Sequence, residues 1–270
     1  MSNTTAAWFE DRIAAAVAPL LPGFAVEAMA EIDSTNTELM RRARSGRVEP
    51  VLLVAERQTA GRGRLGRPWQ SAQQQEEQPS LTFSLGLPLA PADWSGLSLA
   101  VGVSVAESLD PSGERKVGLK WPNDLWVDDR KLAGILIETA LPHAGAPGAQ
   151  RYLVIGIGIN IGAREADGMR TPPAWLRQWR PDATAPEVLR ELAEPLVRSV
   201  LAFEAQGFAQ FAERFAARDV LRGREVVLSD GTAGVCEGVA WSGELQVRTA
   251  AGLQTITSDE VSVRPRGMAL

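Results

Sequence analysis

The chain has 270 residues, of which 45% are apolar, and its formal net charge is −5. It is long enough to bury a full hydrophobic core, and no apolar run reaches the roughly 20 residues that a membrane span needs. The first residues lack the basic flank, apolar stretch and cleavage site of a signal peptide. Cys236 and His143 are the only residues of their types, which excludes an internal disulfide and argues against zinc sites and Ser-His-Asp catalysis. These counts predict a cytoplasmic globular protein.

The spacing of apolar residues predicts helices and strands up to about residue 217. Ser34 and Thr35 are suited to cap the second helix, whose first turn contains Glu38. In chain order the predicted elements are helix 8–20, strand 24–32, helix 37–44, strand 51–55, strand 81–87, helix 95–109, strands 124–127 and 130–137, strand 152–161 and helical segments over 186–217.

The composition changes near residue 219. From there to residue 265, short strand-like runs are separated by turns at a spacing of about 8–12 residues, which is typical of a small β-barrel or sandwich. We therefore predict two domains, a larger one over 1–218 that mixes helices and strands, and a small all-β domain over 219–270.

The segment Glu56–Trp69 concentrates positive charge in an acidic chain. Four arginines fall within eleven residues, three glycines alternate with them, and no acid follows Glu56 within the segment. Glycine lets the backbone approach a ligand closely, and guanidinium groups bind phosphate or carboxylate with two hydrogen bonds. A solvated basic turn is the alternative interpretation. Gly61 and Gly66 have the spacing of a P-loop, but Arg67-Pro68 stands where Lys-Ser/Thr is required, which excludes an ordinary P-loop.

A second polar region lies on a predicted hairpin. Asp128-Asp129 is suited to form the turn between strands 124–127 and 130–137. This register places Asp124 and Lys131 on one face as diagonal neighbours, with Cβ atoms roughly 7 Å apart. A carboxylate and an ammonium in that arrangement are suited to hold a metal-phosphate and a ligand carboxylate together. An ordinary surface ion pair is the alternative.

The apolar run 152–161 predicts a central strand. Gly156 and Gly158 within it indicate close approach of another backbone or of a ligand. They do not form a dinucleotide-binding fingerprint, because Ile161 occupies the place of the third glycine. Asn160 ends the run and is suited either to bond a nucleotide or to cap the strand.

Five motifs, taken together, resemble those of the biotin protein ligases. They occur in the order found in that family, and the likeness covers nearly the whole chain from about Asp33. The motifs are Ser34-Thr35-Asn36, Gln58–Trp69, Lys120-Trp121-Pro122-Asn123-Asp124, Lys131-Leu132-Ala133-Gly134 and Gly156-Ile157-Gly158-Ile159-Asn160. The resemblance implies an α+β fold with a mixed sheet and helices like those of class II aminoacyl-tRNA synthetases, followed by a small SH3-like β-barrel.

Two features depart from the family pattern. Residues Ser71–Pro79 replace the Gly-Asn turn that usually follows the arginine loop. Only about 33 residues precede Ser34, which leaves no room for a winged helix-turn-helix and implies a stand-alone ligase without a DNA-binding domain.

The resemblance also implies a reaction. Biotin's carboxylate attacks the α-phosphate of Mg-ATP, giving biotinyl-5′-AMP and pyrophosphate, and a lysine of a biotin carboxyl carrier domain then takes the biotin. Preorganised cations suit this chemistry, because two anions must meet and charge develops on the α-phosphate. ATP, Mg²⁺ and biotin are thus the implied small molecules. The carrier domain of a biotin-dependent carboxylase is the implied partner of a monomer or homodimer, with neither nucleic acid nor membrane involved.

The resemblance assigns roles residue by residue. The residues implied in biotin binding are Ser34, Thr35, Asn36, Gln58, Gly61, Gly63, Arg64, Leu65, Lys131 and Gly134. Those implied in ATP binding are Arg62, Arg64, Arg67, Trp69, Lys131, Asn160, Trp175 and Arg264, and either Trp69 or Trp175 stacks on adenine. The implied catalytic residues are Lys131, Arg64 and Asp124, and Asp124 is also the candidate magnesium ligand.

Three other functions match the sequence less well. A lipoate or octanoate ligase shares the fold but resembles this chain less in the arginine loop and in Lys120–Asp124. A biotin-binding regulator without catalysis should carry a DNA-binding segment. A nucleic-acid-binding module is supported only by the arginine loop, because the acidic chain shows no broad basic face.

Overall fold

The computed structural model describes residues 8–69, 80–114, 116–141, 150–164, 171–257 and 263–267. His143 and the segment Ser71–Pro79, both singled out in the sequence, lie outside these ranges. Contacts divide the chain into two compact units. The first unit comprises Met1–Ala90, Leu132–Glu165 and Ala174–Arg198, and the second comprises Pro91–Lys131, Ala166–Pro173 and Ser199–Leu270.

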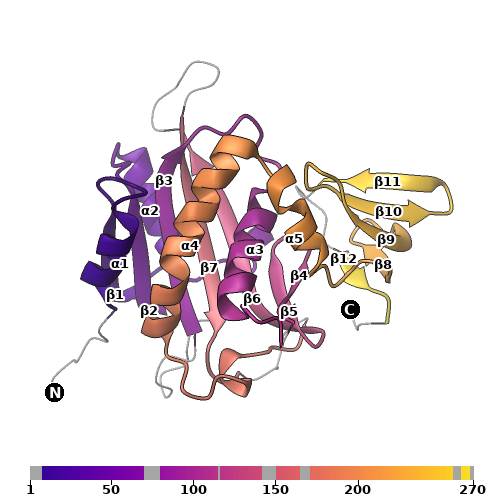
Figure 1. Ribbon diagram of the computed structural model, residues 1–270, viewed down its shortest axis with the longest axis horizontal. Helices are drawn as coiled ribbons and strands as arrows, with labels where there is room; N and C mark the ends of the chain where they lie inside the picture. Colours follow the sequence, from indigo (N-terminus) through magenta and orange to yellow (C-terminus); the bar gives the residue numbers. More distant parts are fainter. Residues whose placement is uncertain are drawn as a thin grey trace. The chain divides into compact units, whose positions relative to one another are not determined.

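A mixed β-sheet organises the first unit (Figure 1). Its strand order is β1-β2-β3-β7-β6, in which β1 is parallel to β2 and the other neighbours are antiparallel. The strands are β1 (Ala25–Ile32), β2 (Val51–Gln58), β3 (Ser80–Leu89), β7 (Arg151–Asn160) and the part of β6 (Arg130–Ala140) that begins at Leu132. β3 and β7 are buried along nearly their whole length, because their apolar runs lie between other strands and beneath helices.

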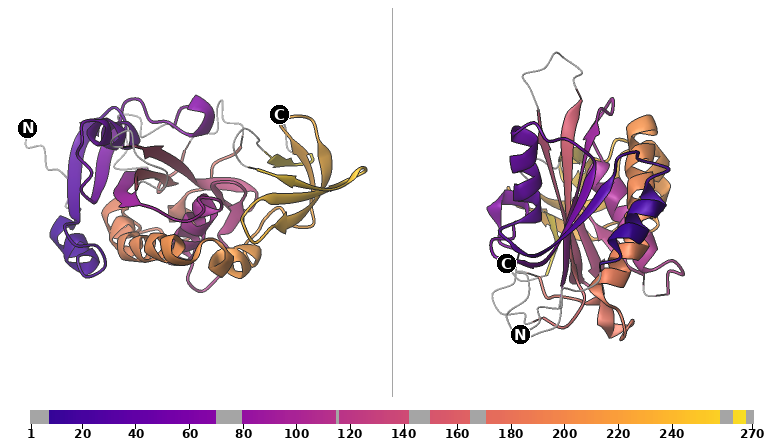
Figure 2. Two further views of the ribbon diagram at one scale, coloured as in Figure 1. Left: turned by 90° about the horizontal axis from the view of Figure 1, so that it is seen from above. Right: turned by 90° about the vertical axis from the view of Figure 1, so that its left-hand side faces the viewer.

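Helices cover both faces of this sheet, as the right-hand view of Figure 2 shows. α2 (Thr35–Arg44) lies on one face, and α1 (Glu10–Val17) lies on the opposite face with the first part of α4 (Ala185–Gln206). Two short 3-10 turns, η1 (Arg64–Gly66) and η2 (Leu176–Gln178), also belong to this unit.

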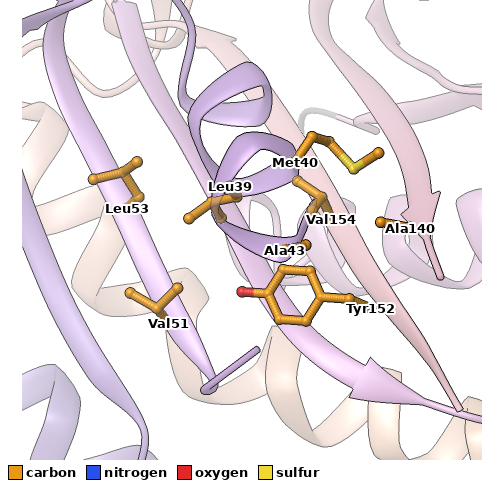
Figure 3. Close-up of a cluster of buried hydrophobic side chains, with 8 residues drawn as sticks. All are labelled: Leu39, Met40, Ala43, Val51, Leu53, Ala140, Tyr152 and Val154. Carbon is orange, nitrogen blue, oxygen red and sulfur yellow. The ribbon is translucent and has the colours of Figure 1, made fainter. Parts of the chain in front are cut away.

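The core beneath α2 fixes the position of that helix on the sheet. One stripe of α2 packs against side chains from β2, β6 and β7 (Figure 3). The cluster consists of Leu39, Met40, Ala43, Val51, Leu53, Ala140, Tyr152 and Val154. Burial raises the pKa of Tyr152 to about 12, and its hydroxyl donates to the Glu49 carbonyl at 3.3 Å. This packing holds the polar N-terminus of α2 against the sheet.

The second unit combines a small α/β layer with a five-stranded antiparallel sheet. α3 (Leu97–Leu109) packs on β4 (Gly118–Lys120) and β5 (Asp124–Val127), and η3 (Ala209–Phe211) and α5 (Ala212–Ala216) pack on α3. The five-stranded sheet has the order β11-β10-β9-β8-β12. Its strands are β8 (Glu225–Leu228), β9 (Ala233–Val239), β10 (Leu245–Thr249), β11 (Gly252–Ile256) and β12 (Val263–Pro265).

The predicted α+β class is confirmed, and most predicted elements lie within a few residues of their expected bounds. α2 begins at Thr35 rather than at residue 37, with Ser34 as its N-cap. β4 was not predicted, because three residues are too few to show a period. The domain boundary at residue 219 stays a prediction. None of the helices in the described part of the chain is long and apolar enough to cross a membrane.

Candidate active site

The N-terminus of α2 is a buried polar cluster. Ser34, Thr35 and Asn36 are each 3% exposed. The Ser34 hydroxyl accepts a hydrogen bond from the Thr37 N–H at 3.4 Å, which is the capping role that the sequence suggested. Gln58 ends β2, and its Oε1 accepts from the Thr35 N–H at 2.8 Å. Ser34, Thr35 and Asn36 are consecutive residues at the start of α2, and Thr35 is hydrogen-bonded to Gln58. These four predicted biotin-binding residues therefore lie close together.

Asn36 is bonded on both sides of its amide. Its Nδ2 donates to Glu138 Oε2 at 2.9 Å, and its Oδ1 accepts from the Ser84 hydroxyl at 2.6 Å. A Cβ at Gly156 would lie 2.2 Å from Asn36 Oδ1, so β7 must carry glycine there for Asn36 to fit. The sequence indicated that another backbone or a ligand approaches Gly156, but the approaching group is a side chain of α2.

The arginine loop is a closed hairpin. The Trp69 N–H donates to the Gly61 carbonyl at 2.8 Å, and the Gly63 N–H donates to the Arg67 carbonyl at 2.7 Å. Leu65 lies between them in the left-handed conformation, with a φ of 56° and 58% exposure. A Cβ at Gly61 would lie 2.5 Å from the Trp69 carbonyl oxygen, so the base of the hairpin requires glycine.

The arginines of this hairpin have different surroundings. The Arg62 Nη2 contacts the two carboxylate oxygens of Glu138 at 3.1 and 3.2 Å, and its Nε donates to Thr37 Oγ1 at 3.2 Å. Arg64 begins η1 and is half-buried, whereas Arg67 is exposed. Arg62 is thus tied to the polar cluster of α2, and Arg67 presents its charge to solvent.

Trp69 lies directly on the backbone of β7. A Cβ at Gly158 would lie 2.4 to 2.8 Å from three atoms of the indole ring. The Arg164 guanidinium lies 5.7 Å from the centre of this ring and donates to Asn160 Oδ1 at 2.8 Å. Asn160 is 4% exposed, and its Nδ2 donates to the Ala174 carbonyl at 2.9 Å. Arg164 therefore brings together two residues that the sequence assigned to ATP binding.

Two further predicted residues of the first unit have simpler settings. Gly134 pairs with Gly158 in the ladder between β6 and β7. Trp175 precedes η2 and is partly exposed, and its backbone N–H donates to Gln178 Oε1 at 3.3 Å.

In the second unit, Asp124 and Lys131 form the predicted pair. Lys131 Nζ lies 2.7 Å from Asp124 Oδ1. Asp128 and Asp129 have φ angles of 50° and 59°, the two positive values that a type I′ turn requires. The Lys131 N–H donates to the Pro172 carbonyl at 2.8 Å, which fixes the backbone that carries the ammonium. The side chains of Lys131 and Asp124 are 30% and 17% exposed, and the Asp124 Oδ1 atom of the pair is itself buried.

The remaining predicted residue of this unit is Arg264, which lies on β12 opposite Val227 of β8. The described residues contain no group of three or more His, Cys, Asp and Glu side chains placed to hold a metal ion. Asp124 stays the candidate magnesium ligand, since nucleotide sites usually hold this ion through one or two carboxylates together with phosphates and water.

Four residues of this arrangement were not predicted: Thr37, Ser84, Glu138 and Arg164. Ser80, Thr82 and Ser84 occupy every second position of a buried strand. This alternation indicates in the sequence that one face of β3 is polar. Glu138 ends the run that begins at Lys131, but the side chains it contacts are 76 and 102 residues away. Only the tertiary structure reveals those contacts.

Known proteins share this sequence pattern. The sequence model of the Biotin/lipoate A/B protein ligase family matches residues 28–160. The chain is 34% identical over 254 residues to the bifunctional ligase/repressor BirA of Escherichia coli (strain K12), a match covering 90% of this chain and 75% of that protein. It is 32% identical over 247 residues to the biotin–[acetyl-CoA-carboxylase] ligase of Paracoccus denitrificans, covering 86% of this chain and 98% of that protein.

A solved structure has the same fold. The biotin protein ligase from Aquifex aeolicus, solved in complex with biotin and ATP, matches with a TM-score of 0.72 and 29% sequence identity. The match covers 89% of this chain and 98% of that one. The chain belongs to the biotin/lipoate A/B protein ligase family.

Proposed function

We propose that the protein is a biotin protein ligase that activates biotin with Mg-ATP and transfers it to a lysine of a biotin carboxyl carrier domain. A biotin carboxylate oxygen attacks the α-phosphorus, and pyrophosphate leaves. The neutral amine of the carrier lysine then attacks the acyl carbon, AMP leaves and the amine loses a proton. The observation that carries this proposal is the buried cluster at α2 joined through Glu138 to the arginine hairpin, which puts neutral hydrogen-bonding groups beside cations.

The cluster at α2 suits the ureido ring of biotin, which offers two N–H donors and one carbonyl acceptor. The hydroxyl and amide groups of this cluster include both hydrogen-bond donors and acceptors. Three of the four residues that carry them are buried. Such a site rejects a ligand that lacks the matching groups, because its own polar atoms are then left unpaired. The residues assigned to biotin are Ser34, Thr35, Asn36, Gln58, Gly61, Gly63, Arg64, Leu65 and Gly134, with Lys131 on the carboxylate.

The hairpin supplies positive charge for the phosphates and the acyl-adenylate. Its backbone N–H groups and guanidinium groups are the kind of donors that stabilise charge developing on a transferring phosphorus. The residues assigned to ATP are Arg62, Arg64, Arg67, Asn160 and Arg264, with Lys131 on the α-phosphate and Trp69 or Trp175 on adenine.

Lys131 is assigned the central charge of the first step. Its ammonium stands in a partly exposed ion pair with Asp124, and a ligand carboxylate that reaches the exposed side of the ammonium can replace the aspartate as its partner. Neutralising the biotin carboxylate and the α-phosphate lowers the repulsion between the two anions. Asp124 is then available to a magnesium ion or to the incoming carrier lysine. Magnesium, when bound with ATP, supplies further neutralisation of the phosphates.

The partner and the compartment follow from the same proposal. The acceptor is the carrier domain of a biotin-dependent carboxylase, and the ligase acts as a monomer or homodimer in the cytoplasm. Cys236 is buried and free, and burial raises the pKa of its thiol to about 12, so it has no part in the proposed chemistry.

The test is transfer to a carrier domain, scored by intact mass. The protein is incubated with ATP, Mg²⁺, a purified carrier domain and either biotin or lipoate. We expect the carrier to gain one biotinyl group and nothing from lipoate, and a carrier whose lysine is replaced by arginine to stay unmodified. Modification by lipoate alone would assign the chain to the lipoate branch of its family, and an unmodified carrier with both acids would contradict ligase activity.

A further inference from the structure

In the polar cluster of the first unit, the internal hydrogen bonds determine which donors and acceptors are left to bind a ligand. Glu138 accepts a hydrogen bond from the side-chain amide of Asn36 at 2.9 Å. A carboxylate only accepts, so the Asn36 nitrogen must point to Glu138 and the Asn36 oxygen must point to Ser84, 2.6 Å away. Glu138 thereby fixes the amide of Asn36 in one of its two orientations, and the Leu136 carbonyl, 3.4 Å from the same nitrogen, favours that orientation more weakly.

This orientation propagates through two hydroxyl groups. The Asn36 oxygen can only accept, so the single hydroxyl hydrogen of Ser84 must be donated to it. Ser84 Oγ also lies 2.7 Å from Thr35 Oγ1, and with its own hydrogen committed it can only accept there. The Thr35 hydrogen then has two possible acceptors, Ser84 Oγ at 2.7 Å and Gln58 Oε1 at 3.1 Å, and we assign it to the nearer one, because two hydroxyl oxygens this close need a hydrogen between them. It is then not available for Gln58 Oε1, which already accepts the Thr35 N–H.

As a result, the Thr35 hydroxyl can act only as an acceptor toward a ligand. Thr35 Oγ1 donates inward to Ser84 and keeps a lone pair for a hydrogen-bond donor. A ligand N–H satisfies that lone pair, and the ureido ring of biotin has two such groups. The dithiolane ring of lipoate has no N–H and would leave that lone pair without a donor.

We propose that Glu138 and Ser84 are positioning residues that make Thr35 an acceptor for a ligand N–H, and so select biotin over lipoate. Glu138 has a second connection, because its carboxylate also holds Arg62 of the hairpin, whose Nε is bonded to Thr37. The same carboxylate thus orients the neutral cluster and anchors the cationic loop. This inference rests on the proposed ligase function.

The test compares Michaelis constants for biotin and ATP, measured by pyrophosphate release. Ser84→Ala frees the Thr35 hydrogen, and we expect the KM for biotin to rise about tenfold while the KM for ATP changes less than about twofold. The matched control for a lost glutamate is Glu194→Gln, which removes the partner of Arg198 from an exposed ion pair on α4 and should leave both constants unchanged.

A suppressor pair tests the role of Glu138 more directly. Asn36→Asp places two carboxylates within hydrogen-bond distance, and we expect the KM for biotin to rise about a hundredfold. Adding Glu138→Gln restores a donor opposite the introduced carboxylate and should recover about tenfold of that loss, although Glu138→Gln alone weakens biotin binding. Losses that simply add in the double variant would overturn the proposal.

Two results separate this inference from the function on which it rests. If the unaltered protein releases no pyrophosphate with biotin, the ligase proposal fails. If it does so normally, and Ser84→Ala and Glu138→Gln leave the KM for biotin unchanged or move the KM for ATP equally, only the positioning role fails. Thermal unfolding of each variant identifies any that do not fold, and Ser84→Ala, the smallest change, keeps the test decisive in that case.

Discussion

The two polar regions of the protein are built differently. Around Asn36, neutral and charged groups are bonded to one another at the base of a buried cluster, and glycine in β7 makes room for them. Asp124 and Lys131 instead form a partly exposed ion pair beside a tight turn. A buried network is costly to alter at any member, whereas an exposed ion pair contributes about 0–1 kcal/mol to stability. Under the proposed function, the first region recognises a ligand by shape and polarity, and the second provides charge for the reaction.

The largest effect is expected at Lys131. Lys131→Ala should lower the rate of adenylate formation about 100- to 1,000-fold in single-turnover assays, because it removes the cation that neutralises two approaching anions. The unfolding temperature should barely change. Arg130→Ala, which removes the adjacent, partly exposed cation, and Lys120→Ala should cost far less rate. Equal losses at Lys120 and Lys131 would show that the reactive charge has been assigned to the wrong lysine.

Arg64→Gly should release the intermediate. Arg64 lies at the turn of the hairpin, and losing a charge-assisted hydrogen bond of about 1.5–3 kcal/mol should speed escape of biotinyl-AMP about ten- to a hundredfold. Pyrophosphate release should survive better than transfer to the carrier, and bystander proteins should become biotinylated. Loss of adenylate synthesis without bystander labelling would instead place Arg64 on the phosphates.

Adding one methyl group to β7 should separate biotin binding from nucleotide binding. Gly156→Ala directs a Cβ into the Asn36 amide, and Gly158→Ala directs one into the Trp69 ring. We expect Gly156→Ala to raise the KM for biotin about tenfold, because it displaces a buried bonded amide. Gly158→Ala should act mainly on the KM for ATP. The same response to both variants would mean that the two glycines do not serve separate ligands.

A smaller effect, on stability alone, is expected at Asp219 in the second unit. Burial raises its pKa to about 6, and its Oδ2 has no hydrogen-bond partner among the described residues. Because the folded state holds this proton more tightly than the unfolded state, stability falls as the pH rises from about 4 to 6. Asp219→Asn should therefore stabilise the protein by about 1–3 kcal/mol at pH 7.5 and by little at pH 4, as measured by denaturant unfolding.

The control for this pH dependence is Asp230, whose pKa is shifted in the opposite direction. The Thr232 N–H lowers the pKa of the exposed Asp230, so its contribution to stability is present above about pH 4 and is lost on acidification. Asp230→Asn should remove a small stabilisation at neutral pH and none in acid. A stabilisation by Asp219→Asn that is the same at both pH values would show that charge burial is not its cause.

Local patterns predicted much of this structure. The turn at Asp128-Asp129 and the pairing of Asp124 with Lys131 followed from strand register. A glycine inside a central strand indicated close approach at Gly156, but not that the approaching group is a side chain. These features depend on neighbours in the chain or on one strand's packing. Whether the residues assigned to biotin and ATP bind them stays a prediction.

The contacts that join the regions of the first unit were not predictable. Glu138 reaches Arg62 and Asn36 across 76 and 102 residues, and no local period specifies such partners. Ser84 carried a signal, since polar residues alternate along a buried strand, but the signal identifies a face and not the side chain that contacts it. The closure of the arginine loop into a hairpin likewise depends on backbone bonds that its composition does not reveal.

The most direct test of this account is pyrophosphate release without a carrier domain. The protein is mixed with Mg-ATP and either biotin or lipoate, and the pyrophosphate formed per chain is measured. The account predicts a rapid release close to one pyrophosphate per chain with biotin, followed by a slow phase as the adenylate escapes, and no release with lipoate. Release with lipoate but not with biotin would contradict it.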